Sequence, residues 1–89
     1  MKDNSLKDNK KLLLIDDDPN LILLVKDYLE FRGYNVDTAE NGREALEVLD
    51  HLVPDMIICD VMMPEMDGYT LVKHIREEPV TNRIPVLFL

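Results

Sequence analysis

The sequence contains a single cysteine, few basic residues and no long apolar run, and each shortage excludes a class of protein. Cys59 is the only cysteine among 89 residues, so no disulfide can form within the chain, which fits the reducing cytoplasm. No apolar run approaches the roughly 20 residues that a transmembrane helix needs. Residues 1–10 lack the apolar core of a secretory signal, and we expect residues 1–9 to form a disordered polar tail.

Acidic residues dominate the charge of the chain. Lys and Arg number 10 against 18 Asp and Glu, which gives a net charge of −8. An acidic surface repels phosphate groups, so we expect this segment neither to bind nucleic acid nor to be anchored electrostatically to a membrane. The length suffices for one domain and is too short for two, and we assign that domain to residues 10–89.

Short apolar runs alternate along the chain with segments of helical periodicity. Residues 11–15 form an apolar run that stops abruptly at three aspartates, as a strand buried on both faces does. Asp18 and Pro19 then suit the cap and first turn of a helix, and Gly33 suits its end. The same reasoning predicts strands at 11–15, 34–39, 56–60 and 86–89, and helices at 19–32, 43–52 and 68–78. This alternation is typical of an α/β fold with helices on both faces of a parallel sheet.

Acidic residues end two of the predicted strands. Asp16 and Asp17 end the first, and Asp60 ends the third. In a parallel sheet, functional residues gather at the carboxyl ends of the strands. If the first and third strands are neighbours, the three carboxylates repel one another unless a cation lies between them. Mg²⁺ suits such a site, and a carboxylate in it can act as a nucleophile toward phosphorus.

The segment after Asp60 supports this interpretation. Pro64 and Gly68 predict an irregular turn before the third helix. An irregular turn leaves backbone carbonyl groups free, and one of them is expected to complete the coordination of the metal.

Three segments carry a family resemblance: LLLIDDDP (12–19), IICDVMMPEMDG (57–68) and IPVLFL (84–89). They resemble the receiver domains of two-component response regulators, and the resemblance extends from Lys10 onward. It implies a flavodoxin-like, doubly wound parallel sheet of order 2-1-3-4-5, here ending after the fourth strand as 2-1-3-4. The first helix should cover one face of this sheet, and the second and third helices the other.

The resemblance also assigns roles to individual residues. It implies that Asp60 is the phosphoacceptor, that Asp17 binds Mg²⁺ directly, and that Asp16 acts on the metal through water. The backbone carbonyl of Met62 is expected to be a further metal ligand, and the Met62 side chain to influence hydrolysis of the acyl phosphate. The implied partner is a histidine kinase or a phosphotransfer protein that donates the phosphoryl group. The chain would then be a signalling domain that catalyses its own modification, not an enzyme.

The resemblance stops at the last residue of the chain. Complete receivers carry a Ser or Thr after the fourth strand and a Lys after the fifth, and this sequence ends at Leu89, before either. We therefore expect residues 10–89 to be a partial receiver that lacks the last strand and two helices, with impaired switching. The apolar fourth strand would be an open sheet edge, which predicts a homodimer or larger assembly through this strand.

Less specific interpretations apply to several of these residues. Taken alone, the run Asp16–Asp18 is better explained as a solvated turn that caps a helix, and only Asp60 with its loop favours a metal site. An alternative function is a phosphohydrolase with Asp16 as nucleophile and Asp18 as acid, and another is a purely structural, oligomerising fragment. We expect His51 and His74 to be exposed surface residues. Strand alternation turns Cys59 away from Asp60 and into the core.

Overall fold

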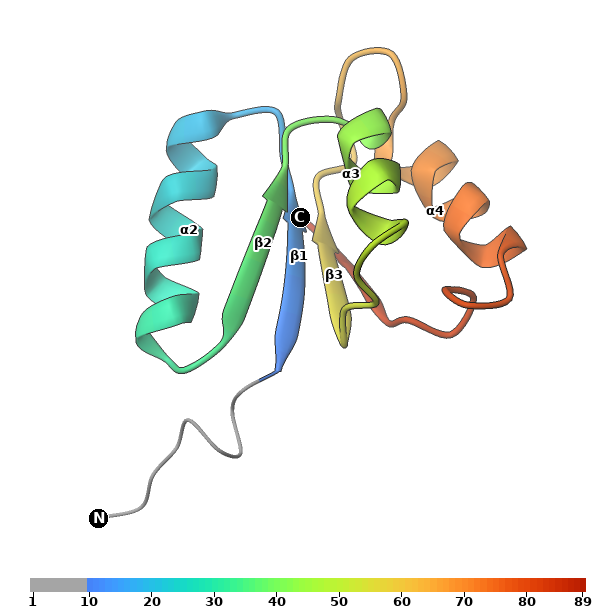
Figure 1. The fold of residues 1–89 in the computed structure, drawn as a ribbon. Coiled ribbons are helices and arrows are strands. Elements are labelled where there is room, and N and C mark those ends of the chain that lie inside the picture. Colours follow the sequence, from blue (N-terminus) through green and yellow to red (C-terminus); the bar gives the residue numbers. More distant parts are fainter. Residues whose placement is uncertain (1–9) are drawn as a thin grey trace.

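The computed structural model describes residues 10–89, so the tail expected at residues 1–9 lies outside the described residues. Within residues 10–89, strands and helices alternate as predicted (Figure 1). The elements are β1 (Lys11–Ile15), α2 (Pro19–Phe31), β2 (Asn35–Ala39), α3 (Gly42–Leu49), β3 (Met56–Cys59), α4 (Gly68–Glu77) and β4 (Val86–Phe88). Every predicted element is present, and its ends differ from the expected ones by no more than three residues.

Each helix begins at a side chain that accepts a hydrogen bond from the first turn. The Asp18 carboxylate accepts from the N–H of Asn20 at 3.0 Å, at the start of α2. Asn41 and Asp67 do the same for α3 and α4, each at 2.8 Å. These contacts satisfy backbone donors that have no partner inside the helix, which explains why the three helices start at these positions.

The largest error in the predicted boundaries is the end of α3, which we expected at residue 52 and which the structure ends at Leu49. The N–H of His51 donates to the carbonyl of Val48, 3.0 Å away and only three residues earlier. The Leu52 N–H donates to the same carbonyl at 3.0 Å, so the last turn mixes 3₁₀ and α-helical spacing, a common way for a helix to satisfy its terminal carbonyls.

The sheet is parallel and has the order β2-β1-β3-β4 that we expected. In the pairing of β1 with its two neighbours, Ile15 lies opposite both Ala39 and Cys59. The Asp60 N–H extends this ladder by donating to the Ile15 carbonyl at 2.9 Å. The register therefore brings Asp16 and Asp60 to the same level at the carboxyl edge of the sheet.

Two apolar clusters hold the sheet between its helices. As predicted, α2 covers one face, and α3 and α4 cover the other (Figure 1). The cluster under α2 consists of Leu12, Leu14, Ile22, Val36 and Ile58, with Val25, Leu29, Tyr34 and Met56 packed against it. The cluster under α3 and α4 is larger and contains Leu13, Ile15, Ala39, Ala45, Ile57, Cys59, Met63, Leu71, Ile75 and Ile84. Strand alternation accounts for this division, since successive residues of β1 point to opposite faces.

The strand β4 forms one edge of the sheet, as predicted. It pairs with β3 on one side only. Leu87, in the middle of β4, is 49% exposed, because within residues 10–89 no helix covers this end of the sheet on the side of α2. No helix in these residues combines the length and the apolar character that crossing a bilayer requires.

Candidate functional site

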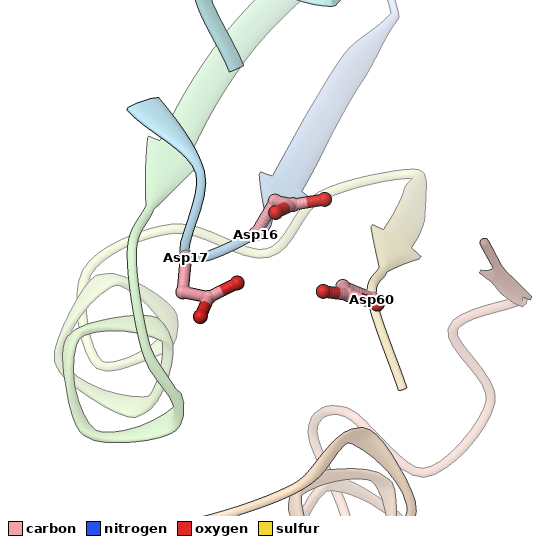
Figure 2. Close-up of side chains that lie close together, drawn as sticks. All are labelled: Asp16, Asp17 and Asp60. Atoms are coloured by element: carbon pink, nitrogen blue, oxygen red, sulfur yellow. The ribbon is translucent and has the colours of Figure 1, made fainter. Parts of the chain in front are cut away.

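Three carboxylates meet at the carboxyl ends of β1 and β3 (Figure 2). One oxygen each from Asp16, Asp17 and Asp60 lies within 4.8 Å of the others. Asp16 is buried, Asp60 is partly buried and Asp17 is exposed, so one side of this acidic site is open to solvent. These residues come together because β1 and β3 are adjacent in the sheet, as predicted.

Asp16 is the most buried member of the group, with 3% of its surface exposed. Burial raises the pKa of the Asp16 carboxyl above its ordinary value. The hydrogen bond that Asp16 Oδ1 accepts from the Asp18 N–H, at 2.9 Å, partly opposes this rise in pKa. The charges of Asp60, Asp17 and Asp18 add to the rise in pKa. Ionised Asp16 is therefore unfavourable in this site unless a positive charge compensates for it.

The loop after Asp60 is irregular, as its Pro and Gly residues predicted. The Met62 N–H donates to Asp60 Oδ1 at 3.2 Å, so the backbone of Met62 lies beside the carboxylate. The Met62 side chain is 78% exposed, whereas the next residue, Met63, is buried in the core and anchors the loop. Glu65, in the same loop, has a φ of 70°, a left-handed conformation that residues other than glycine rarely adopt.

The donor set fits a hard divalent cation. All of the candidate ligand atoms are oxygens, the donors that Mg²⁺ and Ca²⁺ prefer. Two ligands on opposite sides of a Mg²⁺-sized ion lie about 4 Å apart. The spread of 4.8 Å therefore needs only a small side-chain movement, or one ligand that acts through water.

Asp18 does not belong to this group of carboxylates. Its side chain accepts hydrogen bonds from the N–H groups of Asn20 and Leu21 and caps α2, as we expected. A general acid for the alternative phosphohydrolase reaction would have to point into the site. The capping role of Asp18 therefore disfavours that alternative.

Cys59, His51 and His74 are not part of the carboxylate site. Cys59 is fully buried in the cluster under α3 and α4, and burial raises the pKa of its thiol to about 12, so it is not a nucleophile. His51 and His74 are exposed, as expected. They line a groove of about 730 Å³ with residues of α3 and α4, and none of the three clustered aspartates lines it.

Residue spacing did not reveal how closely Gly68 approaches the backbone of Asp60. A Cβ atom at Gly68 would lie 2.5 Å from the Asp60 carbonyl oxygen and 3.0 Å from the Val61 Cα atom. The sequence marked Gly68 as part of a turn, and its only other signal is that a glycine, a poor helix former, opens a helix there.

Comparison with known proteins agrees with this geometry. The family model described as "Response regulator receiver domain" matches residues 12–89. The transcriptional regulatory protein TrcR of Mycobacterium tuberculosis is 39% identical over 79 residues, which cover 89% of this chain and 30% of TrcR. The chain spans about a third of the length of TrcR and of two further curated relatives, the response regulator Rre1 and the transcriptional regulatory protein PhoP.

Solved structures give the same picture. The signal receiver domain of a signal transduction histidine kinase from Syntrophus aciditrophicus has a TM-score of 0.85 and 41% identity, over 90% of this chain and 61% of that one. The receiver domain of the sensor histidine kinase PA1611 from Pseudomonas aeruginosa has a TM-score of 0.84 and 26% identity, over 90% of this chain and 66% of that one. That structure is described with a magnesium ion coordinated in its active-site cleft.

The burial of Asp16 makes a prediction about stability. Asp16→Asn removes a buried negative charge and keeps an oxygen to accept the Asp18 N–H, so we expect the free energy of unfolding at pH 7 without divalent ions to rise by about 0.5–2 kcal/mol. Because the folded-state pKa of Asp16 is raised, the native chain binds a proton more tightly than the unfolded chain. The penalty of ionised Asp16 is thus present above the folded pKa and fades as the pH falls through it.

Urea unfolding of both proteins from pH 7 downward tests this prediction. The advantage of Asp16→Asn should shrink as the pH approaches the ordinary aspartate value. Asp37→Asn, at an exposed position of β2, is the control and should change stability by less than about 0.5 kcal/mol. An Asp16→Asn protein that is less stable than the unmodified chain at pH 7 would contradict the proposed electrostatic penalty.

Proposed function

Because this chain belongs to the response regulator receiver domain family, we propose that it is a phosphoacceptor module of a two-component phosphorelay. In this proposal Asp60 takes the phosphoryl group, and the donor is a histidine kinase or a phosphotransfer protein. The observation that carries the proposal is the convergence of Asp60 with Asp16 and Asp17 at one edge of the sheet. The domain acts as a signalling switch, not as an enzyme with a separate substrate.

Asp60 is suited to attack phosphorus. Its Oδ1 is oriented by the Met62 N–H, at 3.2 Å, which leaves the second oxygen for bond formation. In the transfer, a bond forms between this oxygen and phosphorus, and the bond from phosphorus to the donor's imidazole nitrogen breaks. The electron pair of that bond stays on the nitrogen. Partial burial of Asp60 keeps part of the solvent away from the resulting acyl phosphate.

We assign a Mg²⁺ ion to the same three carboxylates. Asp17, Asp60 and the Met62 carbonyl would be direct ligands, and Asp16 would act through water. Bound Mg²⁺ would supply positive charge that offsets the negative charge of the transferring phosphoryl group. The all-oxygen donor set and the magnesium ion described in the receiver domain of PA1611 both support this assignment.

Asp16 and Asp17 have different tasks in this proposal. Asp17 is exposed, so its carboxylate can replace a water molecule on the arriving ion. Asp16 is buried and held by the Asp18 N–H at 2.9 Å, so it contributes a fixed negative charge beneath the site. That charge attracts the cation, and it would oppose phosphorylation when no cation is bound.

We expect phosphorylation of the 89-residue chain to be weak. Residues 10–89 contain no counterpart of the Ser or Thr after the fourth strand or of the Lys after the fifth, so within this segment neither can pair with the phosphoryl group. A chain that continues with such groups would stabilise the transferred charge better and would switch more completely.

Labelling with acetyl phosphate tests the proposed site. We expect Mg²⁺-dependent incorporation of one acid-stable but base-labile phosphate at Asp60, lost in Asp60→Asn and increased in a chain extended beyond Leu89. Asp17→Asn should weaken Mg²⁺ binding by more than about tenfold, because even residues that only orient metal ligands have effects of that size. Mass spectrometry of the peptides and calorimetric titration with Mg²⁺ provide the two measurements.

The same experiment separates the alternatives. Phosphate on Asp16 would support the phosphohydrolase and contradict the receiver proposal. An oligomerising fragment with a vestigial site would show neither labelling nor any effect of Asp17→Asn on Mg²⁺ binding. Asp27→Asn is a matched control, because it removes one exposed acid from α2 and should leave both measurements unchanged.

We also propose that the 89-residue chain associates with a second copy through β4. The support is an edge strand with free backbone groups on one side and an apolar residue, Leu87, that is 49% exposed. Pairing of two such edges would join the sheets and bury the leucine of each copy.

Light scattering at increasing concentration tests this association. The unmodified chain should move from monomer to dimer or larger species, and Leu87→Lys should remain monomeric because a charge on an edge strand opposes pairing. Leu23→Lys changes a leucine on α2 that is 61% exposed, more than Leu87, and we expect it to dimerise like the unmodified chain. A monomeric unmodified chain at high concentration, with cooperative unfolding, would contradict association through β4.

A further inference from the structure

Two helices of this chain begin with a buried glycine, and one of these glycines touches the backbone of Asp60. Gly42 opens α3 and Gly68 opens α4, each directly after the residue that caps the helix. A Cβ atom at Gly68 would lie 2.5 Å from the Asp60 carbonyl oxygen, 3.0 Å from the Val61 Cα atom and 3.3 Å from the Asp60 carbonyl carbon. Real Cβ atoms essentially never approach other atoms within 3.0 Å, so any side chain at this position forces a displacement.

The first turn of α4, which carries Gly68, is held firmly in place. Leu71 and Ile75 are 0% and 1% exposed, so the helix is anchored in the larger apolar cluster. The Asp67 side chain accepts the Thr70 N–H at 2.8 Å and fixes the start of the helix. The Gly68 N–H donates to the Val61 carbonyl at 2.8 Å, which ties α4 directly to the segment after β3.

The peptide group between Asp60 and Val61 is held less firmly. The Asp60 N–H is part of the sheet ladder, through its bond of 2.9 Å to the Ile15 carbonyl. The Asp60 carbonyl lies beyond Cys59, the last residue of β3, and the contact it receives is a weak one from the Cys59 thiol at 3.2 Å. A methyl group at residue 68 would therefore push this peptide group, and with it the Asp60 side chain and the backbone of Met62.

We propose that Gly68 is a positioning residue: its lack of a side chain lets α4 seat the Asp60–Val61 peptide so that Asp60 and Met62 face the cation together. The inference rests on the proposed Mg²⁺ site, and it adds a residue that contacts neither the ion nor the phosphoryl group. Loss of this seating should weaken cation binding while the sheet and its core stay folded.

Gly42 provides a matched control in the same chain. It occupies the same position in α3 that Gly68 occupies in α4, and a Cβ atom there would lie 2.6 Å from the Sδ atom of Met66. The Cγ and Cβ atoms of Met66 would lie 3.0 and 3.1 Å away, so all three close contacts are with one flexible side chain, which can adjust without moving the Asp60–Val61 peptide. Gly42→Ala thus introduces the same methyl group at an equivalent helix position without touching the backbone of Asp60.

Calorimetric titration with Mg²⁺ alone, together with urea unfolding, tests the proposal on the 89-residue chain. We expect Gly68→Ala to weaken Mg²⁺ binding by about tenfold or more. Gly42→Ala should retain the affinity of the unmodified chain, whatever each substitution does to stability. Equal Mg²⁺ affinity of Gly68→Ala and the unmodified chain, or equal weakening in both alanine variants, would overturn the proposal.

A measurement on the unmodified chain decides the matter if Gly68→Ala does not fold. Mg²⁺ should slow exchange of the Gly68 amide hydrogen, because fixing Asp60 and Met62 also fixes the Val61 carbonyl to which this amide donates. The Glu44 amide, which donates to Asn41 at the start of α3, should exchange at the same rate with and without Mg²⁺. Gly68 exchange that is insensitive to Mg²⁺, or that changes only together with Glu44, would overturn the proposal.

Asp17→Asn separates failure of this inference from failure of the proposed function. If Mg²⁺ affinity is unaffected by Asp17→Asn, the metal site itself is wrong. If Asp17→Asn weakens binding and Gly68→Ala does not, the metal site stands and the role of Gly68 is refuted.

Discussion

The structure depends on one electrostatic constraint, the concentration of three carboxylates at the tips of two adjacent parallel strands. Parallel pairing fixes the register, so Asp16 and Asp60 cannot move apart without breaking the ladder that ends in the bond from the Asp60 N–H to the Ile15 carbonyl. Burial of Asp16 adds a second cost to its charge and raises the pKa of its carboxyl, and the charges of Asp60 and Asp17 raise this pKa further. The fold therefore holds charges in place that only a proton or a cation can compensate.

The rest of the chain serves to keep this unfavourable arrangement rigid. Apolar side chains on both faces of β1 lock the strand in the middle of the sheet, between β2 and β3. Met63 anchors the loop after Asp60, and Gly68 brings α4 into contact with the Asp60 backbone. Packing in the core thus offsets the electrostatic cost of the carboxylates at the carboxyl edge, as is typical of functional sites built on a rigid scaffold.

The sequence predicted the elements of this fold because its local signals agree with one another. Apolar runs that end in acids marked β1 and β3, and capping residues such as Asp18 marked where helices start. The convergence of Asp16 and Asp60 followed from the strand order, which the family resemblance supplied and which the hydrophobic pattern alone leaves open. The end of α3 was predicted too late, since the tightening at His51 depends on hydrogen bonds that periodicity does not encode.

Contacts between distant backbone segments were beyond the reach of sequence reasoning. The sequence marked Gly68 only as a turn residue. It does not distinguish a glycine that is required by a close backbone contact from one that only adds flexibility. The left-handed conformation of Glu65 was missed for a related reason, since nothing in a glutamate side chain signals a positive φ. Such features depend on the assembled fold and can be recognised only in the three-dimensional structure.

Paramagnetic broadening by Mn²⁺, an oxygen-preferring ion that can stand in for Mg²⁺, tests the central electrostatic claim most directly. In nuclear magnetic resonance spectra at low Mn²⁺ concentration, we expect the amide signals of Asp17, Asp60 and Met62 to broaden first. Signals at the opposite edge of the sheet, where Asn35 begins β2 and Asp55 precedes β3, should remain sharp. Broadening that begins at Asp55, or that spreads evenly over the exposed acids of this chain, would contradict the claim that the fold concentrates charge at one edge to bind a cation.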